Sequence, residues 1–124
     1  GHNGVTSNYN YDLAPYTWQL VQEFQGKDAI FTMPGMPIKC AGAPQKAMYL
    51  SCDHWQKTGR LSGMNVSFCN AGPVLFGCAT YVPPLMKYID KYGINLDFGH
   101  NLTKIDGQSK TAGSKVTKEG EKRK

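Results

Sequence analysis

The sequence lacks several features that would assign it at once to a broad class of protein. No apolar run approaches the roughly 20 residues that a membrane-spanning helix needs. No charged segment followed by an apolar stretch marks a secretory leader. The chain opens with Gly1 rather than Met, so we expect its start to be a cut, a processing site or a cloning scar. We expect the fragment to be soluble.

Acidic residues are few, and the formal net charge is +5. Residues 110–124 contribute +4 of it, because six Lys or Arg residues stand there against Glu119 and Glu121. A nucleic-acid-binding surface needs its cations spread over a folded face. We therefore predict a frayed basic tail over residues 118–124 and no nucleic-acid partner.

Close pairs of metal ligands are also missing. The sequence has four cysteines and three histidines, and none form the tight pairs that zinc sites show. We expect no metal site. Nothing marks the chain as secreted, so the expected state of the cysteines is the reduced thiol.

Strand-like and helix-like segments alternate between residues 12 and 99. Short β-rich runs bounded by Gly or Pro predict strands near residues 29–32, 65–69 and 94–98. Prolines suited to a first helical turn predict helices over about 14–24, 44–56 and 83–92. A leading helix followed by a β-α-β-α-β core predicts an α/β fold, a three-layer Rossmann-like parallel sheet.

After residue 99 the pattern changes. Residues 102–105 and 115–117 predict weak strands, and Asp106-Gly107 resembles a turn, so we expect a small antiparallel appendage over 100–117. The whole chain, 1–124, is predicted to be a single domain.

The loop after the first predicted strand does not have the sequence of a dinucleotide-binding loop. A nucleotide-binding β-α-β unit should carry G-x-G-x-x-G at this point. Here the glycines between Met33 and Pro44 are wrongly spaced, and prolines stand where a pyrophosphate would approach the backbone. We therefore do not assign NAD to this domain.

A cysteine occupies this loop instead. Cys40 precedes the predicted helix and follows Lys39, and both a helix N-terminus and an ammonium group favour a thiolate. The loop lies beyond the carboxyl end of a parallel strand, where open sheets bind ligands. Cys40 is therefore a candidate redox residue, with a buried inert thiol as the alternative.

The sequence around Cys40 is specific. The run from Lys39 to Lys46 reads Lys-Cys-Ala-Gly-Ala-Pro-Gln-Lys and follows Ile-Phe-Thr-Met-Pro at residues 30–34. These segments closely resemble the flavin-dependent sulfide:quinone oxidoreductases, in the branch that includes the mitochondrial enzyme. The resemblance covers most of residues 4–107 in order. Further matching segments are Ser7-Asn8-Tyr9, Thr17-Trp18, His54-Trp55, Lys57-Thr58-Gly59 and Tyr92-Gly93-Ile94.

This resemblance implies a set of functional properties. Members of the family are two-domain flavoproteins that attach peripherally to a membrane, here expected on the cytoplasmic side. Their first domain holds most of the FAD, and this chain is similar to the second, Rossmann-like domain. A cysteine pair takes sulfur from sulfide, and electrons pass through the flavin to quinone. The full-length protein is therefore expected to use FAD, sulfide and quinone, whereas this chain alone should bind no FAD and be inactive.

The resemblance also assigns individual residues. Cys40 matches the first cysteine of the pair and is the expected catalytic residue; the second lies further along the full-length chain. Related branches carry a Glu shortly after the cysteine, but Gln45 and Lys46 occupy that stretch here, so no carboxylate role is carried over. Lys46 is a candidate for facing the flavin or sulfur anions, with a solvated helix lysine as the alternative.

The remaining candidates have simpler expected roles. Cys52 and Cys69 are expected in the core, and Cys78 is the one other thiol that could react. Trp18 and Trp55 are also expected in the core.

Other functions stay open at this point. His54 is expected on a helix surface rather than acting as a base. The chain could be a non-catalytic Rossmann-like module, or a domain of a flavocytochrome-type sulfide dehydrogenase or an NADH:quinone reductase. Homo-oligomers could form through apolar surface that other parts of the full-length protein cover.

Overall fold

The computed structural model describes residues 1–117, and the predicted frayed tail at 118–124 lies outside the described residues. The order of elements confirms the predicted alternation of helices and strands. Each predicted helix and strand is present, with ends shifted by a few residues. The elements are α1 (Ala14–Glu23), β1 (Asp28–Met33), α2 (Ala43–Lys57), β2 (Asn65–Asn70), α3 (Val82–Tyr92), β3 (Asn95–Phe98), β4 (His100–Asp106) and β5 (Thr111–Val116), with short 3-10 turns η1 (Tyr11–Leu13), η2 (Leu61–Gly63) and η3 (Ala79–Tyr81).

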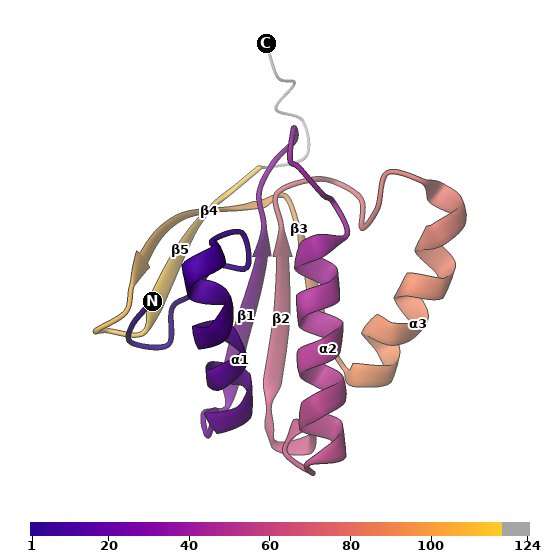
Figure 1. Ribbon diagram of the computed structural model, residues 1–124. Helices are drawn as coiled ribbons and strands as arrows, with labels where there is room; N and C mark the ends of the chain where they lie inside the picture. The colour runs from indigo at the N-terminus through magenta and orange to yellow at the C-terminus, as the bar shows by residue number, and fades with distance from the viewer. Residues whose placement is uncertain (118–124) are drawn as a thin grey trace.

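Three layers make up the fold. The central layer is a parallel sheet in the order β1-β2-β3, in which Phe31 lies beside Phe68 and Phe68 beside Leu96. The helices cover one face of this sheet, and the antiparallel pair β4-β5 lies on the other (Figure 1). This arrangement confirms the predicted α/β class and the antiparallel appendage.

Alternation in β2 shows why these residues form a central strand. Val66, Phe68 and Asn70 are buried, whereas Ser67 and Cys69 between them are half-buried. Phe68 is fully buried, and removing such a side chain from water contributes roughly 1.5–3 kcal/mol to folding. Since β2 has a neighbour on each edge, its β-branched and aromatic residues fit the middle of the sheet.

The helices begin and end where their sequence requires it. Each has a proline in its first two positions, where the missing N–H costs no hydrogen bond. Helix α3 ends at Gly93, whose φ of 63° is left-handed and suits glycine. This turn leads directly into β3.

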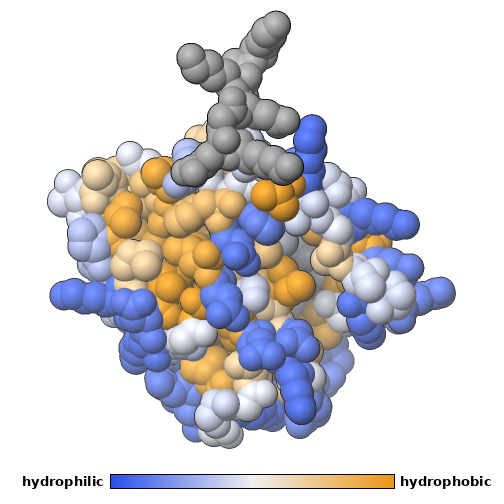
Figure 2. All heavy atoms as spheres, turned by 180° about the vertical axis from the view of Figure 1, so that it is seen from behind, coloured by the Kyte–Doolittle hydropathy of each residue, from blue (hydrophilic) through white to orange (hydrophobic). Residues whose placement is uncertain are grey.

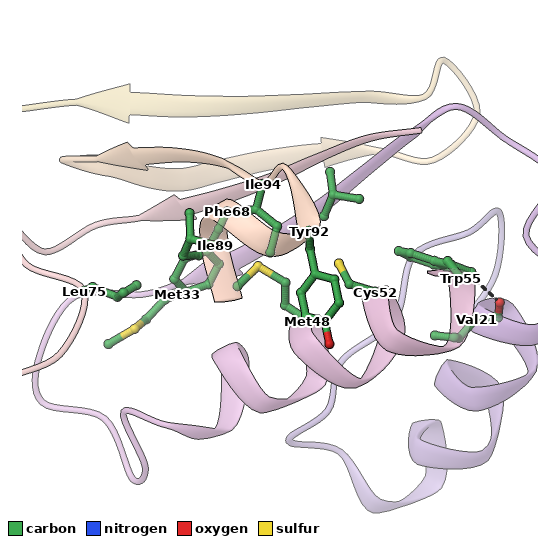
Figure 3. Close-up of a cluster of buried hydrophobic side chains, with 11 residues drawn as sticks. Val21, Met33, Met48, Cys52, Trp55, Phe68, Leu75, Ile89, Tyr92 and Ile94 are labelled. Atoms are coloured by element: carbon green, nitrogen blue, oxygen red, sulfur yellow. Dashed lines mark hydrogen bonds between the residues drawn. The ribbon is translucent and has the colours of Figure 1, made fainter. Parts of the chain in front are cut away.

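Trp55 joins two helices in the core. Its side chain is 3% exposed, and the indole Nε1 donates a 2.8 Å hydrogen bond to the Val21 carbonyl of α1 (Figure 3). The prediction that Trp55 lies in the core is confirmed, but the same prediction for Trp18 is wrong. Trp18 is 52% exposed and packs edge-on against the His54 ring, because α1 lies beside α2 and this side chain reaches the outer surface of α2.

Gly99 lets the chain pass from the sheet to the third layer. Its φ of 71° is left-handed, and a Cβ at this position would lie 3.3 Å from the Thr117 carbonyl oxygen.

The face of the molecule that carries the β4-β5 hairpin exposes apolar side chains. Viewed from behind, Figure 2 shows apolar surface between polar side chains. Ile30, Ile105 and Val116 are each close to half exposed.

Candidate functional site

The candidate site lies at the carboxyl edge of the parallel sheet, where two loops meet the helix layer. The first loop, residues 34–42, joins β1 to α2 and carries Cys40. The second, residues 71–78, follows β2 and leads into η3 and α3. Because both strands end at this edge, the loops lie next to each other, as is usual for ligand sites in open α/β sheets.

Cys40 is exposed and lies just before the N-terminus of α2, as predicted. Its carbonyl oxygen accepts two hydrogen bonds. The Ala43 amide, the first of the helix, donates one at 3.2 Å. The Tyr9 hydroxyl, which comes from the N-terminal segment, donates the other at 2.9 Å. The backbone of Cys40 is therefore tied both to α2 and to a distant part of the chain.

The first turn of α2 is built without a side-chain cap. Gly42 is the N-cap residue, and the Lys46 amide donates a 2.9 Å hydrogen bond to the Gly42 carbonyl. With Pro44 in the first turn and Cys40 accepting from Ala43, little free N–H remains at this end. The backbone donors that a helix N-terminus offers to a phosphate are therefore few at this loop, which also lacks the G-x-G-x-x-G sequence.

A pocket of about 340 Å³ opens beside this helix end. Its walls are mainly aromatic and aliphatic, and Lys46 is the one cation among them. The lining residues come from α2, the loop after β2, η3 and α3: Gly42, Gln45, Lys46, Tyr49, Phe76, Tyr81, Pro84 and Leu85. Lys46 is exposed, and its side chain contributes to a pocket wall whose surface is almost entirely apolar.

Gln45 is the buried polar residue of the pocket. It is 2% exposed, and its Nε2 donates a 2.7 Å hydrogen bond to the Leu75 carbonyl. Its Oε1 accepts a 3.2 Å hydrogen bond from the Tyr49 hydroxyl. Burial, and to a smaller extent the nearby charge of Cys52, raise the pKa of Tyr49 to about 12, so this hydroxyl keeps its proton at neutral pH.

The other three cysteines lie in different environments. Cys52 is fully buried, as predicted, and burial raises the pKa of its thiol to about 12. Cys69 is half-buried rather than deep in the core, and burial together with the charge of Asp97 raises its pKa. Cys78 is exposed at the start of η3 and is accessible to reagents.

The structure brings some predicted site residues together and adds others. Cys40 and Lys46 both lie at the N-terminal end of α2. Sequence reasoning did not identify Gln45 or Tyr9 as structural partners of the site. Gln45 stands within the specific motif, and Tyr9 within an upstream matching segment, but neither position alone indicates a hydrogen-bond partner.

Neither a metal site nor a membrane-spanning helix is found among the described residues. Within residues 1–117, no three His, Cys, Asp or Glu side chains gather closely enough to hold a metal ion. Among the described helices, none has both the length and the apolar character needed to cross a bilayer.

Comparison with known proteins finds relatives in sequence and a likeness in fold. No protein-family model matches the chain. A chain of the Tetrahymena thermophila mitochondrial ATP synthase is similar in fold, with a TM-score of 0.60 at 12% identity, over 79% of this chain and 27% of that one. A likeness at this identity concerns the fold alone.

Three curated relatives are similar in sequence, and each is called "Sulfide:quinone oxidoreductase, mitochondrial". The Dictyostelium discoideum protein is 41% identical over 90% of this chain and 25% of its own length. The Mus musculus protein is 38% identical over 82% and 22%, and that of Schizosaccharomyces pombe is 30% identical over 94% and 26%. The chain therefore spans about a quarter of these relatives, and it is related by sequence to the sulfide:quinone oxidoreductases.

Proposed function

We propose that this chain is the cysteine-bearing, second-domain segment of a flavin-dependent sulfide:quinone oxidoreductase. The observation that carries the proposal is the exposed Cys40 in its specific motif, at the N-terminal end of α2. An exposed cysteine at this edge of the sheet is accessible to small sulfur compounds and to a second cysteine.

Cys40 is proposed to act through thiol–disulfide chemistry. In the full-length enzyme it would form a disulfide with a second cysteine outside this chain, as the family resemblance implies. Hydrosulfide attacks that disulfide, the bond between the two cysteines breaks, and a new S–S bond leaves a persulfide on one of them. The other cysteine departs as a thiolate and keeps the electron pair of the broken bond.

Lys46 is proposed to help this chemistry by its charge. It lines the pocket beside Cys40's loop, and an ammonium group there attracts hydrosulfide or a sulfur chain. A role toward the flavin is the alternative, with the lysine facing the ring from the mouth of the same pocket. A solvated lysine without either role would leave sulfide consumption unchanged when replaced.

We propose that the β1–α2 loop of this chain does not hold FAD as a dinucleotide. Gly42 and Pro44 do not form a pyrophosphate cradle, and the Ala43 amide is already bonded to Cys40. When bound elsewhere in the full-length enzyme, the flavin would supply a two-electron acceptor that delivers to quinone. We propose that the 124-residue chain alone binds no FAD and has no turnover.

The surroundings of the full-length protein belong to the same proposal. We expect peripheral attachment to a membrane surface, on the cytoplasmic side; the three relatives are named as mitochondrial. Self-association of the isolated chain is supported by exposed apolar residues such as Ile30, Ile105 and Val116. Light scattering at several concentrations tests it.

Two measurements test the central proposal. In the full-length enzyme, Cys40→Ser should abolish sulfide-dependent quinone reduction while FAD content stays stoichiometric. Retained activity would reject Cys40 as the catalytic thiol. In the 124-residue chain, iodoacetamide at pH 7 should modify Cys40 about tenfold faster than the exposed Cys78, because Cys40 follows Lys39 and precedes α2 directly, whereas Cys78 precedes the short 3-10 turn η3. Equal rates would favour a non-catalytic module.

A further inference from the structure

The N-terminal segment, residues 1–13, crosses the molecule and is fastened at several points. Near its start the Lys110 ammonium, at the β4-β5 turn, donates a 2.6 Å hydrogen bond to the Asn3 carbonyl. The Gly4 amide donates to the Tyr16 hydroxyl of α1 at 3.2 Å. The hydroxyls of Thr6 and Thr17 are 2.6 Å apart. The segment is therefore held on the hairpin and on α1 before it reaches the loop of Cys40.

Tyr9 is the point where this segment meets the candidate site. Its hydroxyl donates a 2.9 Å hydrogen bond to the Cys40 carbonyl, between residues 31 positions apart in the chain. The Tyr9 ring is 50% exposed, so the contact is not a by-product of core packing. Because the segment is anchored at Asn3, Gly4 and Thr6, the Tyr9 hydroxyl reaches the loop from a restrained part of the chain.

The loop that Tyr9 reaches has little other support from the backbone. Within the part of the chain that the structure describes, residues 34–41 take part in one backbone–backbone hydrogen bond, from Ala43 to Cys40. The Tyr9 bond goes to the same carbonyl oxygen. Two donors on one carbonyl fix the direction of the peptide that follows Cys40, and with it the place of its Cα relative to α2.

We infer that Tyr9 is a positioning residue that holds Cys40 against the N-terminal end of α2. It touches the cysteine backbone rather than the sulfur, so it acts through Cys40. This inference rests on the proposed role of Cys40, but its structural part, the restraint of loop 34–42, can be measured separately. Without the hydroxyl, the loop opens more often and the thiol spends less time at the helix end.

The test uses Tyr9→Phe in the 124-residue chain, with Tyr11→Phe as the matched control. Tyr11 is 92% exposed and lies two positions further on, so its variant removes the same group nearby. Trypsin is added under native conditions, and mass spectrometry follows cleavage after the exposed Lys39, directly before Cys40. Cleavage after Lys27, at the opposite end of β1, is the internal reference.

Tyr9→Phe should raise the ratio of Lys39 to Lys27 cleavage about fivefold, as expected for the loss of one hydrogen bond. Tyr11→Phe should leave the ratio unchanged. An unchanged ratio in Tyr9→Phe, or an equal rise in both variants, would overturn the inference. Because the result is a ratio, a general loss of stability would move both sites and would not imitate the expected outcome.

Iodoacetamide labelling separates this inference from the proposed function. Tyr9→Phe should lower the ratio of Cys40 to Cys78 modification about threefold to fivefold, whereas Tyr11→Phe should leave it unchanged. If Cys40 in the unaltered chain reacts no faster than Cys78, the proposed thiol activation fails. In that case the Lys39 cleavage ratio still decides whether Tyr9 restrains the loop.

Discussion

The side-chain amide of Gln45 donates a 2.7 Å hydrogen bond to the carbonyl of Leu75, which joins the first turn of α2 to the loop after β2. Both residues are almost fully buried, at 2% and 1% exposure, so water has little access to either partner. The bond holds the first turn of α2 against the loop after β2, and both line the pocket. It also explains how a glutamine, usually a surface residue, can occupy the first turn of a buried helix end.

Replacing Gln45 by Met should destabilise the chain by about 1–3 kcal/mol, because the shape is kept while the Leu75 carbonyl loses its buried donor. Urea denaturation measures the change in the free energy of unfolding. Gln56→Met, at an exposed position in the last turns of α2, is the control and should change it by less than about 0.5 kcal/mol. Equal effects of the two variants would show that the Gln45 bond contributes nothing particular.

Cys52 should resist modification in the folded chain. It is fully buried and its pKa is raised to about 12, so at pH 8 neither access nor thiolate is available. Mass spectrometry after a short exposure to iodoacetamide should find label on Cys78 and none on Cys52 until urea unfolds the chain. Rapid label on Cys52 without urea would mean that the helix layer opens readily.

The same burial predicts a pH dependence of stability. Since the folded pKa of Cys52 lies above its unfolded value, the folded chain holds this proton more tightly. Its contribution is present below about pH 8.5 and is lost as the pH rises toward 12. The free energy of unfolding should fall over this range, and Cys52→Ala should flatten the curve. A curve unaltered by the substitution would assign the loss to other groups, such as Tyr49.

Trp55 and Trp18 should respond very differently to replacement by Phe. Trp55→Phe leaves the Val21 carbonyl without its donor and opens space beside α1, so we expect a loss of about 2–4 kcal/mol. Trp18→Phe alters a half-exposed ring and should cost less than about 1 kcal/mol. Thermal unfolding of both variants checks the contrast, and a larger loss in Trp18→Phe would contradict the described packing.

Asp106 should order the β4-β5 turn in its charged form. Hydrogen bonds from Ser109, and to a smaller extent from the Gln108 amide, lower the pKa of Asp106, whose Oδ1 accepts from both amides. A lowered folded pKa means that the stabilisation is present above the unfolded value near 4 and is lost as the pH falls through the folded value. The NMR shifts of those two amides should therefore move together below pH 4, and Asp106→Ala should abolish that titration.

Much of the backbone could be predicted because its signals are local. Prolines and glycines mark where helices and strands begin and end. Gly93, for example, ends α3 in the left-handed conformation, which glycine adopts more easily than other residues. The alternation in β2 predicts its buried face. What these signals share is that each depends on neighbours within a few positions.

The errors and omissions concern contacts between distant segments. Trp18 has the composition of a core residue, but whether it is covered depends on where α1 lies against α2. The hydroxyl of Tyr9 reaches Cys40 across 31 positions, and Gln45 reaches Leu75 across 30. The motif around Cys40 predicted the location of the site, while its supporting hydrogen bonds could be found only once the loops were placed in space.

The strand order β1-β2-β3 follows the order of the chain, which has a consequence for how the domain assembles. Each strand pairs with the next strand in the sequence. The sheet can therefore grow from the β1-α2-β2 unit by the addition of α3 and β3. No pairing has to wait for a distant end of the chain to return. Because loop closure stays moderate at each step, the folding rate should resemble that of mixed α/β domains rather than slower all-β ones. Phe68 lies in the central strand beside both Phe31 and Leu96, so substitutions there should slow folding more than substitutions in β3.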